Sequence, residues 1–150
     1  MTRLERCELA IKKGYTYNAE NGNIYNKHQK EITGKFNTGY IKIQLRVNNK
    51  NYHLKGHIFG WYCVYKECVV MLDHINGIRY DNRISNLRGV TCQQNQWNQQ
   101  KAKGYHWNKS AKKWHSQIVL NRNKIYLGCF NTEEEARQAY LNAKQIYHVI

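Results

Sequence analysis

Four side chains between positions 73 and 95 could together hydrolyse a phosphodiester bond. Asp73 and His74 are adjacent, and Asn86 and Asn95 follow within the next 21 positions. A carboxylate and a carboxamide oxygen suit a hard cation such as Mg²⁺, which neutralises charge on a phosphate and on the leaving oxygen. A histidine titrates near neutrality and can take a proton from the attacking water. We therefore expect Asp73 and Asn95 to hold one metal ion beside His74 as general base.

The asparagines of this stretch leave two assignments open. Asn86 precedes a returning strand and could fix either the loop before it or the imidazole ring. Asn82 is an alternative to Asn86. Asn98 lies three residues after Asn95 on the same face of a predicted helix, and we favour Asn95 over it.

The charge of the chain favours a polyanionic partner. The 150 residues carry a net charge of +14. Residues 1–60 contribute +7 (11 basic against 4 acidic residues), residues 61–100 only +1 (4 against 3), and residues 101–150 contribute +6 (9 against 3). Two basic flanks around a nearly neutral centre fit a protein that binds nucleic acid, because neutralising phosphates releases condensed counterions. A ribosome-binding or membrane-surface protein would be basic as well.

Composition places the protein in the cytoplasm. No apolar run approaches the roughly 20 residues that span a bilayer, and the first residues lack the apolar segment of a signal peptide. We therefore expect no membrane partner. The five cysteines are odd in number and scattered, without a Cys-x-x-Cys pair, which predicts free thiols in a reducing compartment rather than a zinc knuckle.

Periodicity predicts an α+β protein of small sheets and helices. A helix is expected over 3–13, a hairpin over 15–25 around Glu20-Asn21-Gly22, and a second hairpin over 40–54. The apolar stretch 56–66 predicts a helix despite Gly60. Strands are then expected over 69–72 and 87–90, a helix over 92–101, three strands over 104–107, 114–120 and 124–130, and a final helix from 133 to about 147, with Thr132 as its N-cap. We divide the chain into a basic β-rich module (1–55), a central module (56–101) and a C-terminal module (102–150).

The central stretch resembles the HNH nuclease family, which has a ββα-metal fold. The resemblance rests on DHING at 73–77, DNR at 81–83, NLR at 86–88 and TCQQNQWN at 91–98. It is similar to phage and intron-encoded members whose last motif residue is asparagine. The resemblance implies Asp73 and Asn95 as metal ligands, His74 as general base and Asn86 as its orienting residue. Asparagine at the last position favours Mg²⁺ or Mn²⁺.

Residues 104–148 resemble the AP2 DNA-binding domain that often follows phage HNH domains. The likeness is carried by GYHW at 104–107, WHSQI at 114–118, YLGCF at 126–130 and the helix after Thr132. In that family a three-stranded sheet enters the major groove, although His106 and Gln117 stand where it usually has arginines. Trp107 and Trp114 either contact DNA or pack against the helix. The residues expected to contact DNA are Lys42, Arg46, Arg88, Trp107, Lys109, Lys113, Trp114, Gln117, Arg122 and Lys124.

Together these patterns predict a metal-dependent DNA endonuclease of homing type. It would nick or cut double-stranded DNA at preferred sites, as a monomer or weak homodimer, and leave 5′-phosphate and 3′-hydroxyl ends. If the protein is phage-encoded, it would act in the host cytoplasm. One alternative is a catalytically inactive DNA-binding regulator on the same scaffold, and another is an RNA-binding or structural protein.

Overall fold

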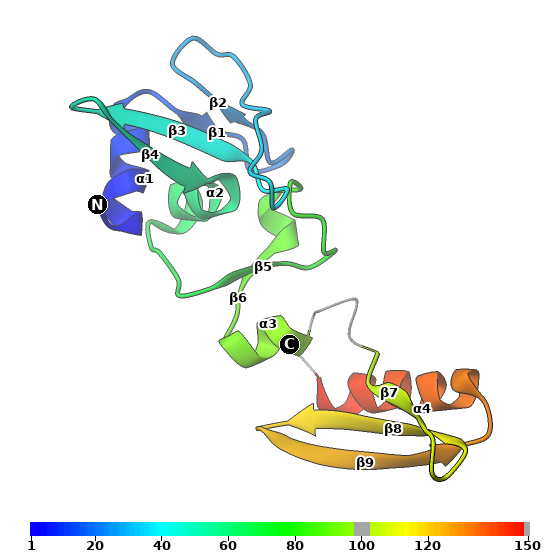
Figure 1. Cartoon of the computed structure of the whole chain (residues 1–150). Coiled ribbons are helices and arrows are strands. Elements are labelled where there is room, and N and C mark those ends of the chain that lie inside the picture. The colour runs from blue at the N-terminus through cyan, green and yellow to red at the C-terminus, as the bar shows by residue number, and fades with distance from the viewer. Residues whose placement is uncertain (98–102, 149–150) are drawn as a thin grey trace. The chain divides into compact units, whose positions relative to one another are not determined.

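The structure is a computed structural model that describes residues 1–97 and 103–148, and it divides into two compact units. The first unit is Met1–Thr91 and the second is Cys92–Ile150; Figure 1 shows the elements of each. The first unit contains α1 (Arg3–Lys12), β1 (Thr16–Tyr17), β2 (Ile24–Tyr25), β3 (Lys42–Val47), β4 (Lys50–Lys55), α2 (Gly56–Tyr65), β5 (Leu72–His74), the 3-10 turn η1 (Ile84–Asn86) and β6 (Leu87–Gly89). The second contains α3 (Cys92–Trp97), β7 (Tyr105–Asn108), β8 (Lys113–Leu120), β9 (Asn123–Phe130) and α4 (Glu133–Tyr147).

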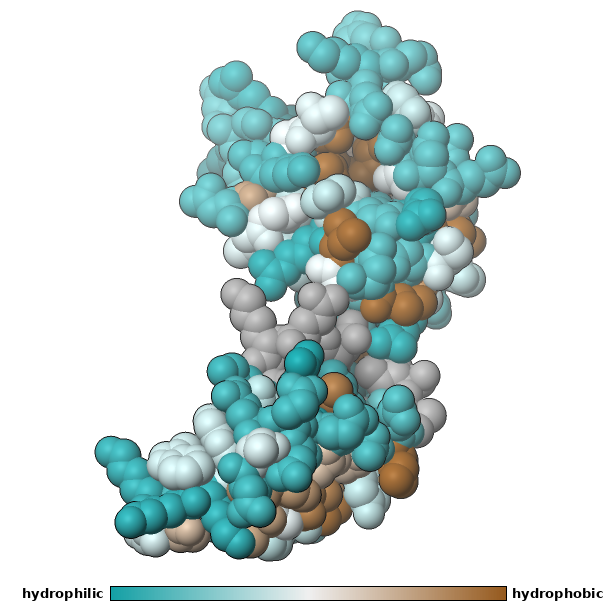
Figure 2. Space-filling view, turned by 90° about the vertical axis from the view of Figure 1, so that its right-hand side faces the viewer, coloured by the Kyte–Doolittle hydropathy of each residue, from teal (hydrophilic) through white to brown (hydrophobic). Residues whose placement is uncertain are grey.

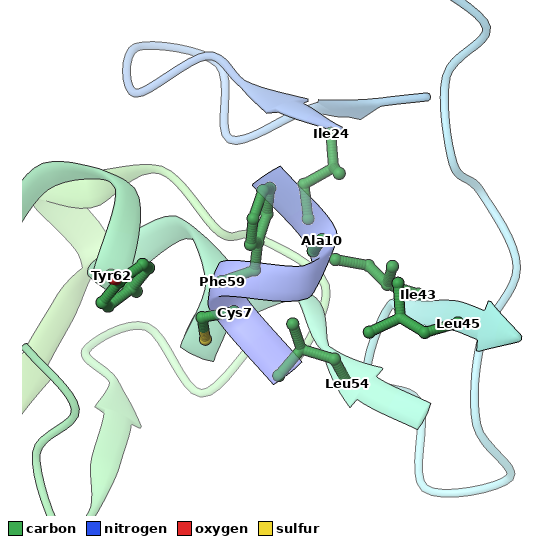
Figure 3. Packing of buried hydrophobic residues seen from close by; sticks show 8 residues of the cluster. All are labelled: Cys7, Ala10, Ile24, Ile43, Leu45, Leu54, Phe59 and Tyr62. Atoms are coloured by element: carbon green, nitrogen blue, oxygen red, sulfur yellow. The ribbon is translucent and has the colours of Figure 1, made fainter. Parts of the chain in front are cut away.

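Helices and hairpins of the first unit share one apolar core. The predicted alternation on β3 is confirmed, because Ile43 and Leu45 are buried while Gln44 and Arg46 are exposed. Side chains of α1 and α2 meet those of three strands in this core (Figure 3). The buried members are Cys7 and Ala10 of α1, Phe59 and Tyr62 of α2, Ile24 of β2, Ile43 and Leu45 of β3, and Leu54 of β4.

This shared core explains why the structure has two compact units where three modules were expected. The expected boundary between residues 55 and 56 lies between β4 and α2, which follow one another directly. Phe59 of α2 is fully buried in the same cluster as Leu54 of β4, so the core continues from residues 1–55 into α2. The division into functional modules remains a prediction.

Gly60 lets α2 pack closely against the first hairpin. A Cβ atom built on Gly60 would lie 2.7 Å from Cε2 and 2.8 Å from Cζ of the Tyr17 ring. The Tyr17 hydroxyl in turn donates a 2.7 Å hydrogen bond to the main-chain carbonyl of Asn82. The glycine that weakens the helical pattern in the sequence is therefore the residue that makes room for this contact.

Replacing Gly60 with alanine is expected to destabilise the first unit. The added methyl group must displace the Tyr17 ring, at a cost of about 1–3 kcal/mol for overpacking, and the better helix propensity of alanine returns about 1 kcal/mol. Urea unfolding followed by circular dichroism measures the difference. A higher midpoint for Gly60→Ala, which helix propensity alone would give, would contradict the close packing.

The strand before the candidate site begins later than predicted. Val70 is 81% exposed, so residues 69–72 do not form a buried strand. The observed strand is β5, which pairs antiparallel with β6 and contains Asp73 and His74 themselves. The two polar residues are thus held by strand hydrogen bonds rather than by a loop that follows the strand.

The second unit is an antiparallel sheet of order β7-β8-β9 with α4 packed on it. Ile118 of β8 packs with Tyr140 and Ala143 of α4, as the spacing of apolar residues on the helix predicts. Thr132 caps α4 through a capping box with Glu135, which confirms the predicted start. The likeness of this unit to an AP2 domain remains a prediction.

Hydrophilic residues cover most of the visible face of each unit (Figure 2). None of the helices within the described residues is long and apolar enough to cross a membrane. The five cysteines all lie in the described part of the chain and are free, as predicted.

Candidate active site

Asp73 lies on β5 opposite Arg88 of β6. The register pairs the two residues directly, which places their side chains on one face of the two-stranded sheet. Nη2 of Arg88 lies 3.1 Å and Nε 3.3 Å from Oδ2 of Asp73, so the guanidinium binds one oxygen of the carboxylate. Asp73 is only 9% exposed. Arg88, expected to contact DNA, thus holds the aspartate in the structure, and its contact with DNA remains a prediction.

His74 is buried and is held by Asn82. The residue is 4% exposed, and its Nε2 lies 3.2 Å from Oδ1 of Asn82. An amide oxygen accepts a hydrogen bond, so this contact fits the tautomer in which Nε2 of His74 carries the hydrogen and Nδ1 is the basic nitrogen. The structure therefore gives the orienting contact to Asn82, the alternative left open in the sequence.

Asn82 is itself fixed on several sides. It is 1% exposed, and its main-chain carbonyl accepts the hydrogen bond of Tyr17. A Cβ atom on Gly56 would lie 2.9 Å from Nδ2 of Asn82, so the start of α2 packs directly against the amide. Among the described residues this Nδ2 has no hydrogen-bond partner. The packing of β1 and α2 thus determines where Asn82 meets His74.

Asn86 holds the loop between β5 and β6 rather than the imidazole ring. Its Oδ1 accepts from the main-chain N–H of Asn76 at 3.0 Å. Its Nδ2 donates to Oδ1 of Asn76 at 3.0 Å and to the main-chain carbonyl of Asp81 at 2.8 Å. These contacts match the first of the two roles considered for Asn86, that of fixing the loop. An orienting role for Asn86 in catalysis remains a prediction. The residue that contacts His74 in the structure is Asn82.

A second histidine and a tyrosine pack against His74. The rings of His57 and His74 lie 5.0 Å apart in an edge-to-face arrangement, and the Tyr40 ring lies 4.8 Å from His57 and 5.8 Å from His74. His57 is buried on α2, and its Nδ1 has no hydrogen-bond partner among the described residues. In the sequence, a histidine within an apolar helix is the one indication of this cluster.

Burial keeps both histidines neutral at physiological pH. It lowers the pKa of His57 to about 3, and the nearby His74 and the Lys55 cation act in the same direction. Burial also lowers the pKa of His74, although the hydrogen bond with Asn82 opposes this shift. A neutral imidazole is the form that can accept a proton, so the lowered pKa of His74 suits a general base.

Replacing His57 with phenylalanine is expected to reduce the acid sensitivity of the fold. Because the folded-state pKa of about 3 lies below the unfolded value of 6.5, the stability contributed by neutral His57 is present above pH 6.5 and is lost as the pH falls toward 3. Between pH 7 and pH 5 this linkage amounts to about 2 kcal/mol. Urea unfolding of both proteins at the two pH values measures it, and equal losses would contradict the prediction.

The predicted second metal ligand lies in the other unit. Asn95 is a half-buried residue of α3, and its pairing with Asp73 remains a prediction. Asn98, the alternative, lies outside the described residues. Asp73 and Asn95 offer hard oxygen donors, which fit Mg²⁺ or Mn²⁺. Among the described residues no three His, Cys, Asp or Glu side chains gather as a metal site.

The other residues expected to contact DNA lie on both units. On β3, Arg46 is exposed and bonds Oδ1 of Asn49 at 3.3 Å, while Nζ of Lys42 lies 5.8 Å from the Phe36 ring. In the second unit the four cations that were expected to contact DNA are all exposed, and Gln117 is half-buried. These cations are Lys109, Lys113, Arg122 and Lys124.

Trp107 and Trp114, the two tryptophans expected to contact DNA or pack on the helix, pair across neighbouring strands. Trp107 is opposite Trp114, with ring centroids 5.5 Å apart. Trp114 shares its face of β8 with Ser116 and Ile118, and Ile118 packs on α4. This register places the tryptophans on the face of the sheet that bears Ile118, but Trp107 is 45% exposed, and contact with DNA remains a prediction for both.

Comparisons with known proteins agree with this site. Residues 64–97 match the HNH endonuclease family. A solved structure described as "DNA binding and cleavage by the HNH homing endonuclease I-HmuI" is 26% identical with a TM-score of 0.47. The match covers 57% of this chain and 51% of that one, so it spans about half the length of the neighbour. Comparison with curated proteins gave no match. The stretch that holds Asp73 and His74 thus lies within the match to the HNH endonuclease family, which supports a nuclease.

Proposed function

We propose that the protein is a metal-dependent endonuclease that hydrolyses phosphodiester bonds of double-stranded DNA, with His74 as general base. The observation that carries this proposal is the buried His74, held through Nε2 by Asn82 and adjacent on β5 to the Asp73 carboxylate. A neutral imidazole that is held through one ring nitrogen can accept a proton from water at the other.

In this proposal the chain supplies the base, its orientation and the metal ligands. Nδ1 of His74 takes a proton from water as the water oxygen bonds to phosphorus. The bond from phosphorus to the 3′ oxygen breaks, and that oxygen takes a proton from solvent. Asp73 and Asn95 would hold one Mg²⁺ or Mn²⁺ ion, which when bound neutralises charge on the phosphate and on the leaving oxygen. The products then carry 5′-phosphate and 3′-hydroxyl ends.

Charge supports a nucleic acid as the substrate. A net charge of +14 provides the electrostatic attraction that nucleic-acid binding requires. In the proposal the second unit, as an AP2-like module, supplies site preference through its sheet, and Lys42 and Arg46 add contacts with the backbone. One site per chain fits a monomer that nicks one strand, and cutting both strands would need a dimer or two visits.

The products of plasmid cleavage test this function. Supercoiled plasmid incubated with the protein and Mg²⁺ is expected to yield nicked circles that DNA ligase reseals, because ligase requires 5′-phosphate and 3′-hydroxyl ends. A single-stranded and a structured RNA of similar length serve as competing substrates. Cleavage of RNA alone would contradict DNA as the substrate, and nicks that ligase cannot reseal would contradict the proposed bond cleavage.

A further inference from the structure

Two cations and two imidazoles surround the ring of Tyr40. Nζ of Lys55, the last residue of β4, lies 4.4 Å from the ring centroid, and Cζ of Arg79 lies 5.5 Å from it. His57 and His74 contact the same ring, at 4.8 and 5.8 Å. Tyr40 therefore links the candidate general base to the two positive charges.

A tight turn before β3 fixes the position of this tyrosine. The main-chain N–H of Phe36 bonds the carbonyl of Tyr40 at 2.9 Å, and that of Gly39 bonds the carbonyl of Phe36 at 2.8 Å. Gly39 has a φ of 87°, a conformation that glycine adopts at little cost. Within this turn the carbonyl of Thr38 accepts a 2.9 Å hydrogen bond from Nη1 of Arg79. The turn thus holds both the aromatic ring and the guanidinium.

The charges of Lys55 and Arg79 are not balanced by carboxylates. Neither forms an ion pair within the described residues. Asp81, two residues after Arg79, is bound instead by Arg83 at 2.6 Å. Arg79 is exposed and lies close enough to His74 to lower the pKa of that imidazole. The exposed guanidinium of Arg79 donates one N–H group to the carbonyl of Thr38, and its other N–H groups can donate hydrogen bonds to an anion.

We propose that Arg79 and Lys55, positioned by Tyr40, bind a backbone phosphate of the nucleic-acid substrate next to the scissile phosphate. This inference rests on the proposed function and adds a substrate contact that the motif pattern does not contain. The flat guanidinium can donate two parallel hydrogen bonds to one phosphate, whereas the ammonium adds a point charge. Because the turn that holds Arg79 also places Tyr40 against His74, a phosphate bound there sets the distance between the backbone and the base.

The test compares two arginine substitutions that change the net charge equally. Arg79→Gln removes the proposed contact, and Arg137→Gln removes an exposed arginine of α4 that faces Glu134. Cleavage of supercoiled plasmid in Mg²⁺ gives KM and kcat. Binding of a fluorescent random-sequence duplex in EDTA, at several salt concentrations, gives the salt slope, which is the slope of the logarithm of the binding constant against the logarithm of the salt concentration.

For Arg79→Gln we expect KM to rise about 10-fold with a smaller change in kcat. We also expect the magnitude of the salt slope to fall by about 1, since one phosphate contact is lost. Arg137→Gln should leave both unchanged.

Equal KM values and salt slopes for the two variants would overturn the proposal. A lower unfolding temperature for Arg79→Gln without a change in slope would also overturn it, because the arginine would then only stabilise the turn. Lys55→Gln gives a second, independent readout with the same expected direction. If the unmodified protein cleaves no plasmid, the proposed function fails, while the salt slope in EDTA still decides whether Arg79 binds phosphate.

Discussion

Replacing His74 with alanine is expected to lower the rate of DNA cleavage by about 10²–10⁴-fold while leaving DNA affinity in EDTA within about 2-fold, since the base acts on the attacking water and not on binding. The physical reason is the loss of the group that accepts the water proton. His74 is 4% exposed, and the imidazole that contacts it among the described residues, that of His57, is buried as well. Single-turnover cleavage of plasmid and a gel shift in EDTA measure the two quantities.

The control for this prediction is His28→Ala, which removes an exposed histidine of the same unit. It should cleave at the rate of the unmodified protein. Far-ultraviolet circular dichroism of His74→Ala must match the unmodified protein, because the side chain is buried. A folded His74→Ala protein that cleaves at full rate would show that another group activates the water.

Asn82→Ala and Asn86→Ala are expected to damage the protein in different ways. Removing Asn82 deprives Nε2 of His74 of its hydrogen-bond acceptor, and loss of an orienting partner of this kind costs about 10–100-fold in rate. Removing Asn86 breaks three hydrogen bonds of the loop between β5 and β6 and lowers the free energy of unfolding by about 1–3 kcal/mol. Cleavage rates and urea unfolding separate the two effects.

Asn82→Asp provides the matched variant, because aspartate retains an oxygen acceptor for the N–H of His74. It should recover part of the rate that Asn82→Ala loses. A larger loss of rate for Asn86→Ala than for Asn82→Ala, at equal stability, would assign the orienting role to Asn86 and contradict the contact between Asn82 and His74.

Local patterns predicted most of the secondary structure. The turn residues Glu20-Asn21-Gly22 predicted the first hairpin, and the alternation of polar and apolar residues predicted β3 and β4. Thr132 predicted the start of α4. The apolar run Val69–Leu72 misled the prediction of β5, because residues before the strand can be apolar and still face solvent, as Val70 does. The bounds of β5 are determined by its pairing with β6, and the residues of β5 alone do not predict that pairing.

The site was predicted in its residue types but not in its contacts. Spacing along the chain could not distinguish Asn82 from Asn86, because both lie within one loop and their side chains bond different groups. The cluster of Tyr40 and His57 around His74 brings together the turn before β3, α2 and β5, and so joins residues more than 15 positions apart. Contacts of this range follow from the fold and have no signature in the motif.

The most direct test of the central claim is cleavage of supercoiled plasmid by the unmodified protein, with Mg²⁺ or with EDTA, beside the Asp73→Ala/His74→Ala double variant. We predict nicked or linear products that require the metal and are absent with the double variant, although the variant still binds DNA in a salt-dependent way. Equal cleavage by the double variant, or a salt-dependent gel shift without any metal-dependent product, would contradict a nuclease centred on Asp73 and His74. The second outcome would instead indicate a DNA-binding protein without turnover.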